Sequence, residues 1–145
     1  MVNSVKGYEY LEHTADVMFR AYGDSPGEML GSAALAMFNA MIDTGTVRPQ
    51  RTWKVELRAE SLEQLAYDWL SELLFLMDSE VVVFSEFQVD LKQDGEIWRL
   101  EGLARGEGID RSRHPFENQV KAVTLHQFRV EGGADGWMMQ AILDV

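Results

Sequence analysis

Two aspartates near opposite ends of the chain are the residues best suited to chemistry. Asp16 precedes an apolar run at 17–19, and Asp144 stands beside Val145, whose terminal carboxylate adds a third negative group. If the chain ends meet, these carboxylates repel one another unless a cation or basic side chain joins them or some are protonated. Oxygen ligands favour a hard ion, calcium or magnesium. The alternative is that they are surface residues at strand ends that never meet.

The histidines form a second candidate set. His13, His114 and His126 could supply metal ligands or a general base, but no pair has the spacing of ligands on a helix. His126 alternates with apolar residues and is expected in the core with its nitrogens hydrogen-bonded. His114 falls within residues 109–115, which are expected to form an exposed loop. We assign no catalytic residue, because the spacing of these histidines does not support an enzyme.

A lone lysine and a group of glycines are further candidates for binding residues. Lys121 lies in a run of small and branched residues at 120–124, where a solvent-exposed strand lysine is the plain interpretation. Gly102, Gly106 and Gly108 lack the lysine and the helix start of a nucleotide-binding loop. These glycines are instead expected to loosen the chain.

Two helices are expected to position these residues. Ser25 can cap the first helix, which runs to about residue 42, and Ser61 can cap the second, which runs to about residue 78. Each serine is followed three residues later by Glu or Gln, as in a capping box. Apolar residues then recur at intervals of three and four, which predicts one buried face on each helix.

The remaining segments are expected to be strands, with a hairpin turn at Asp94-Gly95. The last strand is almost wholly apolar, so we expect it in the centre of a sheet. We therefore predict a single α+β domain, residues 1–145, with two helices packed on a largely antiparallel or mixed β-sheet. Strands are expected within residues 8–22 with a break at 13–14, and at 53–59, 81–91, 97 onward, 119–130 and 137–145.

Composition narrows the classes of partner. The chain has 24 acidic against 13 basic residues and a formal net charge of -11, so direct nucleic-acid binding is not expected. Such acidity suits a basic protein partner or metal cations, although it can also serve solubility alone. The sequence contains no cysteine, which excludes disulfides and thiolate metal sites. It has no signal-like or membrane-spanning apolar run, so we expect a cytoplasmic protein without a membrane partner.

Four separated motifs together resemble the archease family. They are Glu-His-Thr-Ala-Asp-Val at 12–17, a Trp-Leu-x-Glu-Leu-Leu helix within 65–76, Lys-Ala-Val-Thr-Leu-His at 121–126 and the terminal Ile-Leu-Asp-Val at 142–145. The motifs follow one another in the family's order over nearly the whole chain. One departure is Leu125, where many relatives carry tyrosine, and we do not expect it to affect the site.

The resemblance implies a function as well as a two-helix α+β fold. Archeases are protein cofactors, not enzymes, of the GTP-dependent tRNA-splicing RNA ligase, and they promote guanylylation of its active-site histidine and repeated turnover. The resemblance further implies a divalent cation, usually calcium, held by Asp16, Asp144 and Val145, and a role for Lys121 in activating the ligase. The alternatives are a metal-dependent phosphate-ester hydrolase using the same carboxylates and a general chaperone of RNA-processing enzymes.

Overall fold

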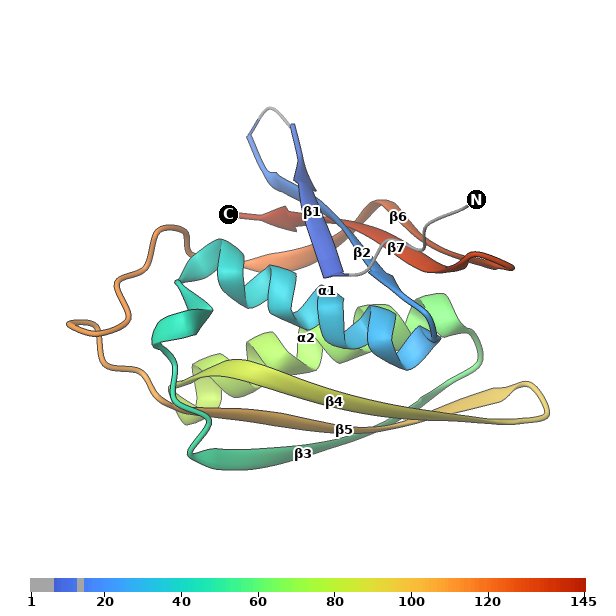
Figure 1. Ribbon diagram of the computed structural model, residues 1–145, viewed down its shortest axis with the longest axis horizontal. Helices are drawn as coiled ribbons and strands as arrows, with labels where there is room; N and C mark the ends of the chain where they lie inside the picture. Colours follow the sequence, from blue (N-terminus) through green and yellow to red (C-terminus); the bar gives the residue numbers. More distant parts are fainter. Residues whose placement is uncertain (1–6, 13–14) are drawn as a thin grey trace.

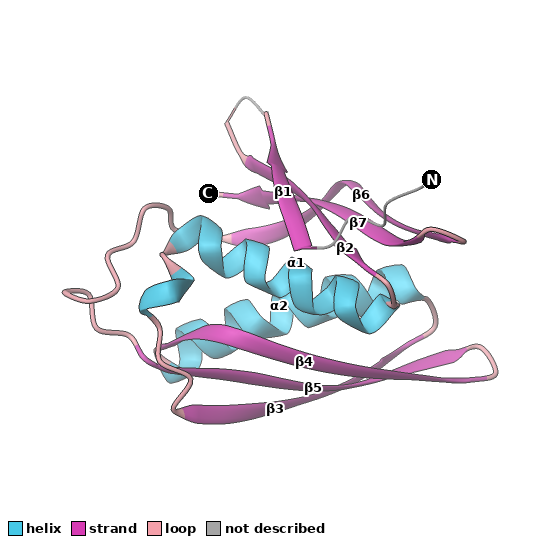
Figure 2. Ribbon diagram, in the orientation of Figure 1, coloured by secondary structure: helices cyan, strands magenta, loops and turns pink. Residues whose placement is uncertain are grey.

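Two helices lie between two antiparallel β-sheets in the computed structural model, which describes residues 7–12 and 15–145 (Figures 1 and 2). The predicted α+β class is confirmed, and the strands form two sheets where one was expected. The helices are α1 (Pro26–Met41) and α2 (Leu62–Glu80), with a short 3-10 turn at Thr44–Thr46. One sheet has the order β1 (Gly7–Leu11), β2 (Val17–Gly23), β7 (Gly136–Asp144), β6 (Ala122–Gly133), and the other β3 (Arg51–Ala59), β5 (Ile97–Gly108), β4 (Val82–Asp94).

Both helices begin at the predicted serine caps. The Ser25 hydroxyl accepts a hydrogen bond from the Glu28 N–H, and the Ser61 hydroxyl accepts one from the Gln64 N–H, each at 3.1 Å. These contacts satisfy backbone donors that the first turn of a helix leaves unpaired. In the part of the chain that the structure describes, neither helix is long and apolar enough to cross a membrane.

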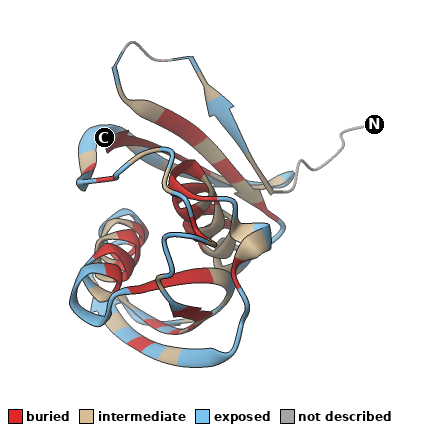
Figure 3. Ribbon diagram, turned by 90° about the vertical axis from the view of Figure 1, so that its left-hand side faces the viewer, coloured by how far each residue is buried: buried red, intermediate tan, exposed pale blue. Residues whose placement is uncertain are grey.

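The hydrophobic core fills the space between the helices and the two sheets (Figure 3). Each sheet buries one face against the helices, because an apolar sheet face and an apolar helix stripe must both be covered. The largest fully buried side chains of the core include Trp69, Phe19, Phe38 and Phe84. The Trp69 indole N–H donates to the Leu30 carbonyl of α1 at 3.0 Å, so the two helices are joined by a polar contact as well as by packing.

The glycines of β5 do not loosen the chain, so that expectation was wrong. Strand β5 continues through Gly102 and Gly106 to Gly108. A Cβ on Gly102 would lie 2.6 Å from the Trp69 ring, and one on Gly106 would overlap the Val83 carbonyl oxygen. These two positions need glycine because neighbouring groups approach the backbone closely.

Strand β7 occupies the centre of its sheet, between β2 and β6, as its apolar sequence predicts. Its pairing with β6 shifts between Thr124 and Arg129, and Gln127 within this irregular stretch has a φ of 53°. The alternation of side chains along β6 is therefore interrupted. His126 is exposed in consequence, which corrects the expectation of a core histidine.

Candidate functional site

The pairing of β2 with β7 brings the two ends of the chain together. The last pair of this antiparallel ladder joins Val17 to Leu143. Asp16 directly precedes Val17, and Asp144 directly follows Leu143, so both aspartates lie at the same end of the β2–β7 ladder, where Asp144 still pairs with Ala122 of β6. Asp144 is exposed and Asp16 is half-buried. The predicted approach of the two chain ends thus has a structural basis in the strand register.

Strand β6 brings Lys121 to the other side of Asp144. Ala122 pairs with Asp144, and the Lys121 N–H donates to the Asp144 carbonyl at 2.7 Å. Lys121 is exposed, and its ammonium group forms no ion pair within the described residues. We call Asp16, Asp144 and the terminal carboxylate of Val145 the acidic edge. Lys121 lies directly beside it through this backbone bond.

A hollow of about 350 Å³ opens next to Asp16. It lies between the ends of β1 and α1 and the segment before β6, and three carboxylates line it: Glu12, Asp16 and Glu117. The Glu117 N–H donates to the Met41 carbonyl at 2.7 Å, which fixes this segment at the end of α1. Sequence reasoning did not identify Glu117, because only this contact with α1 brings it to the hollow.

The donor set of the acidic edge fits a hard divalent cation in its chemistry. Within the described residues, no three His, Cys, Asp or Glu side chains gather closely enough to hold a metal ion. The predicted set needs only two side chains, Asp16 and Asp144, because the chain terminus provides the third carboxylate. All are negatively charged oxygen donors, the type that calcium and magnesium take. Cation binding at this edge stays a prediction.

The histidines take positions that the sequence did not predict. His114 is fully buried, although residues 109–115 were expected to be an exposed loop. Its Nε2 lies 3.0 Å from Glu107 Oε2, and its Nδ1 accepts the Asp110 N–H at 3.0 Å. The correction has a physical reason, because a buried imidazole needs partners for both nitrogens and these two residues supply them. His13, and with it part of the motif at 12–17, lies outside the described residues.

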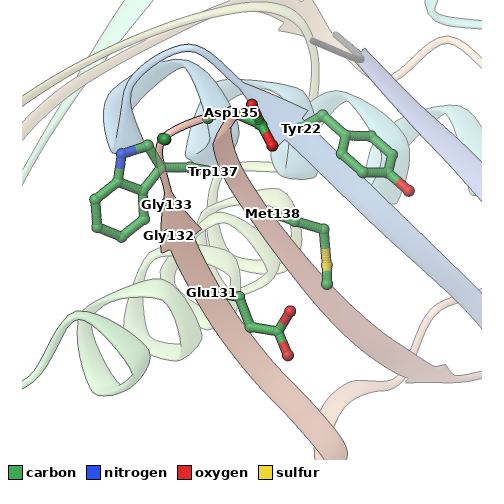
Figure 4. A pocket seen from close by; sticks show the side chains of 9 residues that line it. Tyr22, Glu131, Gly132, Gly133, Asp135, Trp137 and Met138 are labelled. Carbon is green, nitrogen blue, oxygen red and sulfur yellow. The ribbon is translucent and has the colours of Figure 1, made fainter. Parts of the chain in front are cut away.

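A second hollow, of about 370 Å³, lies at the opposite end of β7, where that strand turns back to β6. Figure 4 shows Tyr22, Trp137 and Met138 among the side chains around it. Its carboxylates are Glu131 and Asp135, and none of the acidic-edge residues lines it. It is therefore a separate feature from the predicted site.

Comparison with known proteins gives consistent matches along the chain. A model of the Archease protein family (MTH1598/TM1083) matches residues 8–145. Protein archease of Methanosarcina acetivorans is 45% identical over 147 residues, an alignment that covers 100% of both chains. The matched region includes Asp16, Lys121, Asp144 and Val145.

Solved structures agree with this match. The solution structure of protein 1598 of Methanobacterium thermoautotrophicum superposes with a TM-score of 0.87 at 39% identity, covering 97% of this chain and 100% of that one. The crystal structure of an archease from Thermotoga maritima, described as a possible chaperone, gives a TM-score of 0.56 at 19% identity over 93% and 94% of the two chains. At this lower identity the likeness concerns the fold alone.

Proposed function

The chain belongs to the archease family, and we propose that it is an activator of the GTP-dependent tRNA-splicing RNA ligase rather than an enzyme. In this role it promotes guanylylation of the ligase's active-site histidine and thereby supports multiple turnover. It works in the cytoplasm with a divalent cation, calcium, bound by Asp16, Asp144 and Val145. Lys121 takes part in activating the ligase.

The observation that carries this proposal is the convergence at the acidic edge. Asp16 and Asp144 come from the two ends of the sequence, yet each stands one residue beyond the same final pair of the β2–β7 ladder. Asp144 and the adjacent Lys121 are both exposed. A partner protein can therefore reach negative and positive groups at one place on the surface.

Each residue has a distinct part in the proposed role. The acidic edge supplies the negative charge that would hold the cation, and a bound cation supplies positive charge for phosphate oxygens. Lys121 presents an ammonium group with three hydrogen-bond donors. Since this ammonium has no ion pair within the described residues, it is available to acceptors on the ligase or its nucleotide.

The net charge supports a basic protein partner. The chain carries a formal charge of -11, and an enzyme that binds RNA presents basic surface to its substrate. Opposite charges raise the rate at which two proteins meet, and salt screens this attraction. The archease therefore reaches a basic ligase surface by electrostatic attraction without binding the RNA itself.

The test is ligation of a broken tRNA by the cognate ligase with GTP and divalent metal, in single-turnover and multiple-turnover conditions. A substoichiometric amount of the wild-type protein should increase turnover, and Asp16→Ala or Asp144→Ala should abolish the increase while leaving the fold intact. Asp135→Ala, an exposed aspartate at the opposite end of β7, is the matched control and should stimulate like the wild type. Undiminished stimulation by both acidic-edge variants would contradict the proposal.

Two further measurements separate the alternatives. Turnover of a phosphate ester by this protein without ligase would support the hydrolase. Suppressed aggregation of unrelated client proteins would support a general chaperone, a control suggested by the description of the Thermotoga maritima archease as a possible chaperone. Specific activation requires that ligase turnover rises while both of these activities stay at background.

A further inference from the structure

The connection between β5 and β6, residues 109–121, joins the two sheets and ends at Lys121 (Figure 1). It has no regular secondary structure, so its backbone groups must find partners elsewhere. Those partners lie at the C-terminal ends of α1 and α2 and on β7, so several parts of the fold hold the segment. The bonds are Ile109 N–H to Val81 O (2.9 Å), Glu117 N–H to Met41 O (2.7 Å), the Asn118 side-chain amide to Ala40 O (2.9 Å) and Lys121 N–H to Asp144 O (2.7 Å).

Glu107 and His114 form the buried contact at the beginning of this connection. The His114 side chain is 0% exposed and that of Glu107 is 7% exposed. Glu107 also accepts the Arg48 N–H at 2.8 Å and pairs with the Arg113 guanidinium at 2.8 Å. The carboxylate thus binds the connection to the segment before β3 as well as to β5.

The partners of His114 determine where its proton lies. The Asp110 backbone N–H can only donate, so Nδ1 accepts it and carries no hydrogen. Nε2 therefore carries the proton and donates it to Glu107 Oε2. Nδ1 accepts a hydrogen bond within the local turn, and Nε2 donates a hydrogen bond from that turn to Glu107 of β5.

We propose that Glu107 and His114 are positioning residues that hold the 109–121 connection so that Lys121 stays bonded beside Asp144 at the acidic edge. This inference rests on the proposed function for its effect on ligation. The link to Glu107 is the decisive one, because the bond to Asp110 lies within the turn and does not reach another element. Loss of the link leaves the turn attached to Glu107 through Arg113 alone, so the bonds at Glu117, Asn118 and Lys121 must hold a segment that is less firmly anchored at β5.

Two substitutions at one position separate the two bonds of the ring. In His114→Gln the side-chain amide can replace Nε2 as a donor to Glu107. In His114→Asn the shorter side chain can replace Nδ1 as the acceptor for Asp110 but cannot reach Glu107. Ser112→Ala is the matched control, because it removes the 2.6 Å hydroxyl bond to Asp110 in the same turn and leaves the Glu107 contact intact.

The first measurement is hydrogen exchange of the Lys121 amide by NMR, in the full-length protein without ligase. We expect exchange about tenfold faster in His114→Asn, with rates close to wild type in His114→Gln and Ser112→Ala and unchanged rates for the β2–β7 amides. Equal Lys121 exchange in the Asn and Gln variants would overturn the proposal, as would a uniform increase across all amides. Should His114→Asn fail to fold, Glu107→Asp, which withdraws the carboxylate by one methylene, must give the same local increase.

The second measurement is ligase stimulation as a function of activator concentration. Misplaced Lys121 should raise the half-saturating concentration of His114→Asn several-fold, and His114→Gln should restore the wild-type value. If Lys121 exchanges faster but the two variants stimulate alike, the positioning role is overturned. If the wild-type protein does not stimulate the ligase, the proposed function fails, and the exchange measurement still decides whether Glu107 and His114 hold Lys121 in place.

Discussion

Glu107 and Asp144 carry the same carboxylate group in opposite surroundings. Glu107 is buried and takes part in hydrogen bonds or ion pairs with Arg48, Arg113 and His114. Asp144 is exposed, and within the described residues its side chain takes part in no hydrogen bond or ion pair. A carboxylate whose oxygens are already bonded contributes to folding, whereas an exposed one without partners can accept a ligand.

The pKa of Glu107 reflects this difference. Burial by itself raises the pKa of the Glu107 carboxyl, but hydrogen bonds from the Arg48 N–H and His114, together with the Arg113 charge, outweigh burial and bring the pKa below its usual range. The ionised form is therefore favoured in the fold. Glu107 therefore stabilises the fold through a charged carboxylate whose oxygens are bonded to Arg48, Arg113 and His114.

The largest expected effect is on stability at the buried carboxylate. Glu107→Ala should lower the free energy of unfolding by about 3 kcal/mol, because it leaves the Arg48 N–H, His114 and Arg113 without their shared partner. Urea unfolding followed by circular dichroism measures the change. Glu107→Gln, which keeps the shape and an acceptor oxygen but not the charge, should lose less than Glu107→Ala and still be less stable than the wild type. Wild-type stability of Glu107→Gln would contradict the role given to the charge.

Calcium should stabilise the protein by binding at the acidic edge and not at Glu107. Calcium at about a hundredfold excess over its dissociation constant should raise the free energy of unfolding of the wild-type protein by about 2.7 kcal/mol. The increase should be absent in Asp144→Asn and retained in Asp135→Asn. Calorimetric melting with and without calcium provides the measurement, and an equal increase in all three proteins would place the cation elsewhere.

Acid should weaken the buried carboxylate's contribution. Because the folded-state pKa of Glu107 is lowered relative to the unfolded chain, its stabilisation is present above the unfolded-state pKa and is lost as the pH falls through the folded-state value. Glu107→Gln cannot titrate, so its stability should fall less steeply with acid than that of the wild type. Parallel curves of unfolding free energy against pH would contradict this assignment.

The smallest expected effect is that of removing charge from the acidic edge without metal. Asp144→Asn, measured with a chelator present, should change the free energy of unfolding by no more than about 0.5 kcal/mol, because Asp144 is exposed. A loss comparable to that of Glu107→Ala would show that Asp144 has a structural role. The two carboxylates would then not differ as described.

Local features of the fold could be predicted from the sequence. The serine caps at Ser25 and Ser61 act within three residues, and the Asp94-Gly95 turn joins adjacent strands, with Gly95 at a φ of 61°. Such features depend on neighbouring residues alone, so the pattern of residue types determines them. The central place of β7 was also predicted, because an almost wholly apolar strand is better shielded between two neighbouring strands than at the edge of a sheet.

The burial of His114 and the exposure of His126 could not be predicted from neighbouring residues alone. His126 follows an apolar alternation, but the irregular pairing of β6 with β7 turns it outward. His114 lies in a polar stretch, but Glu107 and Asp110 satisfy its nitrogens in the interior. For His114, partners four and seven residues away supply the missing bonds, and for His126 the irregular strand pairing interrupts the alternation; neither effect can be read from the pattern of apolar and polar residues.

The sequence by itself determined the two helices, the apolar final strand and the carboxylates at the two ends of the chain. Only the tertiary structure decided that Asp16 and Asp144 lie at one end of the β2–β7 ladder, since this depends on the register that ends at Val17 and Leu143. It also decided that Lys121 bonds to Asp144. Strand register is a property of two segments together, and the packing of their apolar faces against the helices selects it.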